Sequence, residues 1–315
     1  MMHAHLLPLS LLSLFAALSP VHASQSPDLT SSQTDTIKSA LSASQLESWE
    51  IGTFAEALLE LDTPSWSPQT PGVQFSSFFS SSPPSSLDEV FTLAKSVTQN
   101  WTATNHVSSN TSNTTQLAAP LLPNSAAGDP PSTGFAIILA NLTGRAQQDN
   151  LPYAEAATSQ LQYLLTSVPK TQDGAISHRP EQLQLWADYV YMVPPFLAYY
   201  GAATGNESVA RMAYDQIRLY RQYLKDNGTS SGKGPSTNGL WQHMAFGSGA
   251  DGGFWSTGNA WAAAGIVRVL AVYASSPLGA SLQTEQADLV QWAHEIQSAL
   301  GPWLVCHVLP TEVRT

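Results

Sequence analysis

Cysteine is nearly absent from this sequence, since Cys306 is the only one in 315 residues. A network of internal disulfides and metal sites built on several cysteines are therefore excluded, and the fold must be held by its core. Charged residues are also scarce, at 11%, and the 12 basic side chains are outnumbered by 23 acidic ones. The net charge of −11 argues against a nucleic-acid partner. The sequence has no lysine-rich patch of the kind that binds a membrane surface, so a membrane partner is not expected.

The chain opens with an apolar run over residues 6–18, followed by Pro20 and by small residues before Ser24. This order is typical of a secretory signal peptide and its cleavage site, and the run is shorter than the ~20 residues that span a bilayer. We therefore expect a signal peptide at 1–23 and a secreted, extracellular protein. Glycosylation sequons support export through a eukaryotic secretory pathway; they begin at Asn100, Asn110, Asn113, Asn141, Asn206 and Asn227.

Outside the polar loops at residues 63–86 and 102–132, the dominant pattern is helical and alternates in pairs. The first helix of each pair is apolar almost all round and needs burial on several sides; these helices are expected at 49–61, 134–140, 183–200 and 260–273. The second carries a one-sided apolar stripe suited to an outer layer; these are expected at 87–97, 153–165, 210–224 and 289–300.

This alternation predicts an all-α fold, an (α/α)6 toroid in which inner helices surround a pocket and outer helices cover them. An irregular helical bundle or solenoid would show the same periodicity. Because the pattern stops after the fourth pair, we expect about four of the six hairpins. The catalytic toroid is assigned to residues 24–300, and an atypical tail to 301–315.

An acidic residue, Asp188, lies in the strongly apolar stretch Leu-Trp-Ala-Asp-Tyr-Val-Tyr-Met. Burial of a carboxylate is costly unless it is paired, so Asp188 needs either a raised pKa or a firm hydrogen-bond partner. A raised pKa suits a general acid. A structural aspartate bonded to backbone or to a tyrosine hydroxyl is the alternative.

Residues 227–259 form a long loop rich in glycine and tryptophan. Glycine permits tight backbone paths, and tryptophan rings offer flat apolar faces for the C–H surfaces of sugars. This composition is typical of a carbohydrate cleft. Individually, Trp255 and Trp261 are more often core aromatics, and His243 is more often a hydrogen-bonded structural residue.

Three ordered motifs carry a resemblance to a known family: Trp186-x-Asp188 with Met192 and Pro195-Phe196, then Gly239-Leu240 with His243, then Trp255-x-x-Gly258-Asn259-x-Trp261. Together they resemble the unsaturated glucuronyl and rhamnogalacturonyl hydrolases of glycoside hydrolase families 88 and 105, most nearly the fungal secreted members. The resemblance implies a six-hairpin toroid, in agreement with the helical pattern.

By this resemblance Asp188 is the general acid/base, and Trp186, His243 and Trp261 contact the sugar. Asp129, in Gly-Asp-Pro-Pro, matches a second pocket aspartate or else serves as a helix N-cap.

Further substrate contacts are expected from His178, Arg179, Trp255 and Asn259. Thr257 stands where bacterial members carry an arginine, which removes a bidentate partner for a sugar carboxylate. Arg179 is a candidate to supply that charge.

The implied reaction is hydration of the C4=C5 double bond in the unsaturated uronyl residue that a polysaccharide lyase leaves behind. Two alternatives remain: an inverting glycosidase that pairs Asp188 with Glu50, and a degenerate, non-catalytic sugar-binding protein. The expected partner is an oligosaccharide. No cofactor or metal is expected, and the protein is expected to be a monomer.

Overall fold

The computed structural model describes residues 29–44, 47–79, 82–107, 117–228 and 235–304. The signal peptide expected at 1–23 lies outside these residues. The chain divides into two units, residues 1–44 and 45–315. The first contains one exposed helix, α1 (Ser31–Ala43), whose first turn is capped by Thr30 and Gln33.

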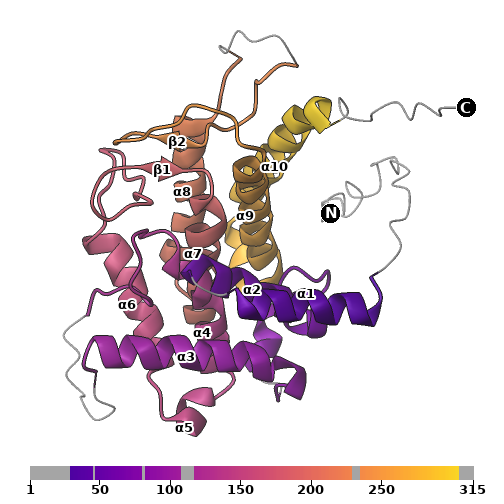
Figure 1. Ribbon diagram of the computed structural model, residues 1–315, viewed down its shortest axis with the longest axis vertical. Coiled ribbons are helices and arrows are strands. Elements are labelled where there is room, and N and C mark those ends of the chain that lie inside the picture. Colours follow the sequence, from indigo (N-terminus) through magenta and orange to yellow (C-terminus); the bar gives the residue numbers. More distant parts are fainter. Residues whose placement is uncertain (1–28, 45–46, 80–81, 108–116, 229–234, 305–315) are drawn as a thin grey trace, which may run out of the picture. The chain divides into compact units, whose positions relative to one another are not determined.

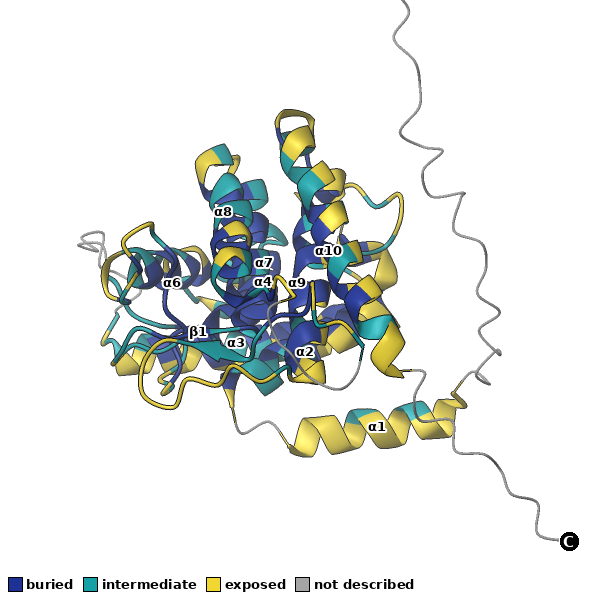
Figure 2. Cartoon of the chain, turned by 90° about the horizontal axis from the view of Figure 1, so that it is seen from above, coloured by how far each residue is buried: buried dark blue, intermediate teal, exposed yellow. Residues whose placement is uncertain are grey.

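The second unit contains the alternating helices that the sequence predicts (Figure 1). The largely buried helices are α2 (Ser48–Asp62), α4 (Gly134–Leu142), α7 (Tyr189–Thr204) and α9 (Ser256–Ser275). Each is followed by a helix with one buried face; these are α3 (Asp88–Thr104), α6 (Tyr153–Thr166), α8 (Glu207–Leu224) and α10 (Gln283–Leu304). Figure 2 shows exposed residues on the outward sides of α6, α8 and α10. The prediction of four inner-then-outer hairpins is confirmed within the described residues.

Short elements interrupt the segments that we expected to be plain loops. They are the 3-10 helices η2 (Pro64–Trp66), η3 (Phe75–Phe79), η4 (Ser85–Leu87), η5 (Pro130–Thr133) and η6 (Pro277–Ser281), together with the short helix α5 (Arg145–Asp149). Their aromatic residues contribute to the core, because Trp66 stacks on Phe78 with ring centroids 5.5 Å apart. The tail assigned to 301–315 begins inside α10, and residues 305–315 lie outside the described part of the chain.

The third apolar helix begins later than its composition predicts. Residues 183–188 precede α7, and Leu185–Trp186 form strand β1, which pairs antiparallel with β2 (Met244–Ala245). A short apolar run does not distinguish strand from helix by periodicity alone. The pairing partner, about sixty residues away, decides it.

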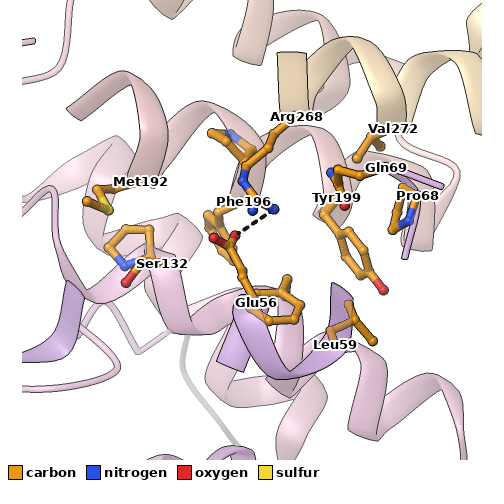
Figure 3. A pocket seen from close by; sticks show the side chains of 13 residues that line it. Glu56, Leu59, Pro68, Gln69, Ser132, Met192, Phe196, Tyr199, Arg268 and Val272 are labelled. Atoms are coloured by element: carbon orange, nitrogen blue, oxygen red, sulfur yellow. Dashed lines mark ion pairs between the residues drawn. The ribbon is translucent and has the colours of Figure 1, made fainter. Parts of the chain in front are cut away.

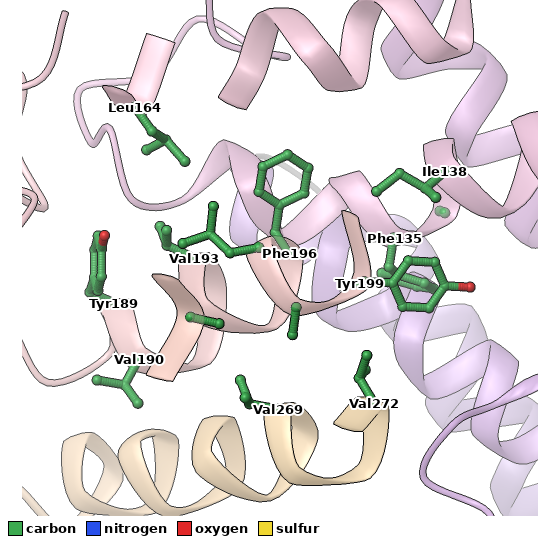
Figure 4. Close-up of a cluster of buried hydrophobic side chains, with 14 of the residues drawn as sticks. Phe135, Ile138, Leu164, Tyr189, Val190, Val193, Phe196, Tyr199, Val269 and Val272 are labelled. Atoms are coloured by element: carbon green, nitrogen blue, oxygen red, sulfur yellow. The ribbon is translucent and has the colours of Figure 1, made fainter. Parts of the chain in front are cut away.

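The core is centred on α7, which packs against α4, α8 and α9 (Figure 4). Val190, Val193 and Phe196 of α7 are buried, and they meet residues of α4 and α9 there. Close approach depends on Gly265 of α9, because a Cβ at that position would lie 2.1 Å from the carbonyl oxygen of Val190. Within the described residues, no helix is long and apolar enough to cross a membrane.

Candidate active site

The strand pair β1–β2 brings Trp186 and His243 together. Trp186 lies opposite Met244 in the ladder, and the Ala187 N–H donates to the His243 carbonyl oxygen at 3.0 Å. The Trp186 and His243 rings then meet edge to face, with centroids 5.7 Å apart. Two of the motifs that the sequence singled out therefore join at one place.

Asp188 follows this strand and occupies the N-cap position of α7, not the helix interior. Its backbone is helical, and its side chain makes no capping hydrogen bond. Burial raises the pKa of the carboxyl, although the backbone hydrogen bond to Asp188 and the charge of His243 act in the opposite direction. The Oδ1 atom is buried and has no hydrogen-bond partner among the described residues. Asp188 is thus a partly buried acid with a raised pKa, and no backbone or tyrosine partner occupies its buried Oδ1 atom.

Asp129 faces the same region from the loop before α4. It precedes η5, but its side chain makes no capping hydrogen bond. Its Oδ1 atom lies 3.5 Å from Nε2 of His178. The loop is fixed there because Ala127 and Gly128 both donate their N–H groups to the His178 carbonyl oxygen. Gly128 allows the contact, since a Cβ would lie 2.4 Å from Nδ1 of His178.

The charges in this region are strongly coupled. Burial, and next the charge of Asp188, raises the pKa of Asp129 to about 7. Burial lowers the pKa of His178 to about 3, so its imidazole is neutral at ordinary pH. The Nδ1 atom of this neutral ring has no partner among the described residues. The site therefore combines the neutral imidazole of His178 with two acids, Asp129 and Asp188, whose pKa values are raised.

Aromatic rings line this group of acids. His178 stacks on Trp186 with centroids 4.6 Å apart, and the Arg179 guanidinium lies 6.0 Å from the Trp186 ring. On the other side, Trp255 meets His243 at 4.8 Å and is 40% exposed. Such an arrangement offers flat apolar surfaces beside acids, as binding of a sugar ring requires.

Asn259 does not present its amide to this group. The side chain is 1% exposed; its Oδ1 accepts from the Trp241 N–H, and its Nδ2 donates to the carbonyl oxygens of Trp241 and Trp255. Hydrogen bonds of Asn259 therefore connect the loop segment at Trp241 to the start of α9. The sequence predicted that this side chain contacts the substrate; in the structure it is buried and helps to position Trp255.

Trp261 contacts a different set of side chains. Its ring lies 4.4 Å from that of Tyr191 and 6.4 Å from that of Trp49. Tyr191 is one helical turn beyond Asp188 and donates its N–H to the Asp188 carbonyl oxygen. The first turn of α7 thus links Trp261 to the acid.

The sequence analysis missed a buried acid, Glu56 of α2. Its Oε2 accepts a hydrogen bond from Tyr191 Oη at 2.6 Å, and its Oε1 lies 3.4 Å from Nη1 of Arg268. Burial is the main reason that its pKa is raised to about 7. Figure 3 shows Glu56 and Arg268 facing each other across a pocket. An acid within an apolar helix, the signal that identified Asp188, would have identified Glu56 too.

Glu50, the partner considered for Asp188, is used at the start of α2. Its Oε2 accepts the Glu47 N–H at 2.9 Å in a capping box. Asp129 is the acid that is electrostatically coupled to Asp188. Across the described part of the chain, no group of three His, Cys, Asp or Glu side chains is placed to hold a metal ion.

Comparison with known proteins agrees with this architecture. The model of Glycosyl Hydrolase Family 88 matches residues 130–306. A possible member of the GH105 family from Salmonella enterica serovar Paratyphi A superposes with a TM-score of 0.56 and 15% identity, over 90% of this chain and 69% of that chain. One from Klebsiella pneumoniae gives 0.56 and 15%, over 95% and 71%. No curated protein sequence matched the chain.

The family model spans more than half of the chain, and it includes Asp188, Trp186, His243 and Trp261. The fold is an all-α toroid of the six-hairpin glycosidase type. The chain belongs to glycosyl hydrolase family 88. It is a glycoside hydrolase, and its substrate class is oligosaccharide.

Proposed function

We propose that this glycoside hydrolase hydrates the C4=C5 double bond of unsaturated uronyl residues on oligosaccharides released by pectin- or rhamnogalacturonan-type lyases. The observation that carries the proposal is the buried Oδ1 atom of Asp188, which has no partner in the described chain and a carboxyl pKa raised by burial. A carboxyl group with a raised pKa and one oxygen without a partner is suited to act as a general acid.

In the proposed reaction, the Asp188 carboxyl transfers its proton to C4 of the sugar. Water then adds its oxygen to C5, and the Asp188 carboxylate takes the proton that this water releases. The net change is addition of one water to the double bond, and the hemiketal opens to free the remaining saccharide. One acid completes the cycle, so neither a second carboxylate nor a nucleophilic side chain is required.

Other side chains are assigned to substrate orientation. We assign Trp186 and Trp255 to contact with apolar sugar faces, and Trp261 to a further aromatic surface. His178, neutral because burial lowers its pKa, is suited to a hydrogen bond and not to proton delivery. Arg179, the guanidinium beside Trp186, is assigned to the uronyl carboxylate.

Unsaturated oligosaccharides prepared with a lyase test the proposal. Their ultraviolet absorbance should disappear with the wild-type enzyme and persist with Asp188→Asn. Asp215→Asn, on the outer helix α8, is the matched control and should retain activity. Persistent absorbance with folded wild-type protein would refute the proposal.

Asp129 supports a second candidate, an inverting glycosidase with two carboxylates. The charge of Asp188 contributes to the raised pKa of Asp129, so the ionisation of Asp129 depends on Asp188. In that case saturated oligosaccharides would be cleaved, and Asp129→Asn and Asp188→Asn would both abolish cleavage. Saturable sugar binding without turnover of either substrate would instead indicate a non-catalytic binding protein.

We also propose that the protein is secreted as a glycoprotein and acts as a monomer. The signal pattern at 1–23 and the sequons support export. Asn100 and Asn227 lie at exposed positions, where a glycan would meet no packed neighbour. Recovery of the protein from the medium of a eukaryotic host, with a mobility shift on enzymatic deglycosylation, tests secretion; light scattering tests the oligomeric state.

A further inference from the structure

Three buried helices meet at a charged cluster outside the set of acids around Asp188. Glu56 of α2 accepts the Tyr191 hydroxyl hydrogen bond from α7 at 2.6 Å. Arg268 of α9 approaches Glu56 at 3.4 Å through Nη1 and binds Glu60 at 2.6 Å through Nη2. The Glu56 and Arg268 side chains are only 9% and 13% exposed. The cluster thus joins helices that are distant in sequence.

Tyr191 is held by this cluster on more than one side. Its hydroxyl is anchored by Glu56, and the Arg268 guanidinium lies 4.9 Å from its ring centroid. The Tyr191 ring also meets that of Trp261, with centroids 4.4 Å apart and planes inclined by 58°. Rotation of Tyr191 would break the Glu56 hydrogen bond, so the buried charges that fix Tyr191 also fix the ring against which Trp261 packs.

Stability alone does not account for such a cluster. Withdrawal of two charges from water is costly, and well-packed apolar side chains of similar volume are often as stabilising as a buried ion pair. The desolvation is evident at Glu56, because burial raises the pKa of this carboxyl to about 7 despite the neighbouring guanidinium. A hydrogen bond and an ion pair are directional, unlike apolar packing, so they can fix a ring in a single orientation.

We infer that Glu56 and Arg268 are positioning residues that, through Tyr191, hold the Trp261 ring in the orientation in which it receives the sugar. Neither residue contacts the reacting atoms. The inference rests on the proposed function for the role of Trp261 as a sugar surface, and it deepens that function by naming the groups on which sugar affinity depends.

The orientation of Trp261 can be measured without any activity. In protein labelled with 5-fluorotryptophan, the ¹⁹F signal of Trp261 is assigned by its absence in Trp261→Phe. Tyr191→Phe, which removes only the hydroxyl, and Glu56→Ala should both shift and broaden that signal. Glu56→Gln retains an acceptor for Tyr191 and should restore a sharp signal.

Glu60→Gln is the matched control, because Glu60 binds the same guanidinium but makes no hydrogen bond to Tyr191. Its Trp261 signal should match that of wild type. Should Glu56→Ala fail to fold, Tyr191→Phe carries the test. An unchanged Trp261 signal in folded Tyr191→Phe would overturn the inference.

Steady-state kinetics on unsaturated oligosaccharides test whether the orientation of Trp261 affects substrate affinity. Tyr191→Phe should raise KM about three- to tenfold, as expected for loss of an aromatic contact, with kcat within about twofold of wild type. Its effect should vanish in a Trp261→Phe background, because Tyr191 acts through that ring. Additive effects, or a loss confined to kcat, would overturn the inference. A wild-type enzyme without turnover would refute the proposed function while the ¹⁹F test stands.

Discussion

The imidazole of His178 stacks on the indole of Trp186, with ring centroids 4.6 Å apart and planes inclined by 21°. Gln184 contacts both residues. Its carbonyl oxygen accepts the backbone N–H of His178 at 2.7 Å, and its side-chain Oε1 accepts the ring Nε1–H of Trp186 at 2.9 Å. The stacked pair of His178 and Trp186 therefore depends on Gln184, a residue that none of the sequence motifs includes.

Gln184→Ala should lower kcat/KM about tenfold, because loss of a partly buried hydrogen bond costs roughly 1–2 kcal/mol and frees the Trp186 ring. Steady-state assays on unsaturated oligosaccharides measure the effect. Gln182→Ala is the control; it removes the acceptor for Ser248 but leaves Trp186 bonded, and it should stay within about twofold of wild type. Equal losses in the two variants would contradict a specific role for Gln184.

Asp129 makes stability depend on pH in a predictable direction. Its pKa rises from 3.8 to about 7 on folding. Between these values the folded protein keeps a proton that the unfolded chain has lost, so the free energy of unfolding falls as pH rises, by up to about 1.4 kcal/mol per pH unit. Asp129→Asn cannot titrate and should show a shallower decline.

Urea unfolding of both proteins at several pH values between about 4.5 and 7 measures these slopes. Glu56 and Asp188, whose pKa values burial also raises, act in the same direction in both proteins, so the difference between the two slopes reports the contribution of Asp129. Parallel slopes would mean that Asp129 does not take up a proton on folding in this range.

Thr257 offers a test of substrate charge. It is exposed in the first turn of α9, two residues after Trp255, where the resembling bacterial enzymes carry an arginine. Thr257→Arg should lower KM for unsaturated uronyl oligosaccharides about tenfold, since a charge-assisted hydrogen bond to a carboxylate contributes roughly 1.5–3 kcal/mol. Thr257→Gln adds hydrogen-bonding groups without the charge and should have little effect. If both variants behave alike, a guanidinium at this position does not meet the uronyl carboxylate.

The helical hairpins were predictable because their signal is local: apolar residues all round for α4 and α9, and a stripe for α8. The strand at Leu185–Trp186 was not, because it exists only through pairing with Met244–Ala245. Asp188 was identified as a buried acid, but its place at the start of α7 depends on where that strand ends. The approach of Asp129 to His178 is also long-range, and Gly128 is its only local sign.

Packing of α7 against α9 provides a prediction about stability with an internal control. A Cβ on Gly265 would lie 2.1 Å from the Val190 carbonyl oxygen and 2.7 Å from Cα of Tyr191, which are backbone atoms that cannot move aside alone. Gly265→Ala should therefore destabilise the protein by at least about 2 kcal/mol, through overpacking.

The control is Gly301→Ala in α10, where an added Cβ meets nothing within 4 Å. This variant should be neutral or stabilising by up to about 1 kcal/mol, because alanine favours a helix more than glycine does. Urea unfolding of the two variants measures both effects. Equal stability of Gly265→Ala and wild type would mean that α7 and α9 are not in close backbone contact, and the first turn of α7, which carries Asp188 and Tyr191, would then lack the support on which the site depends.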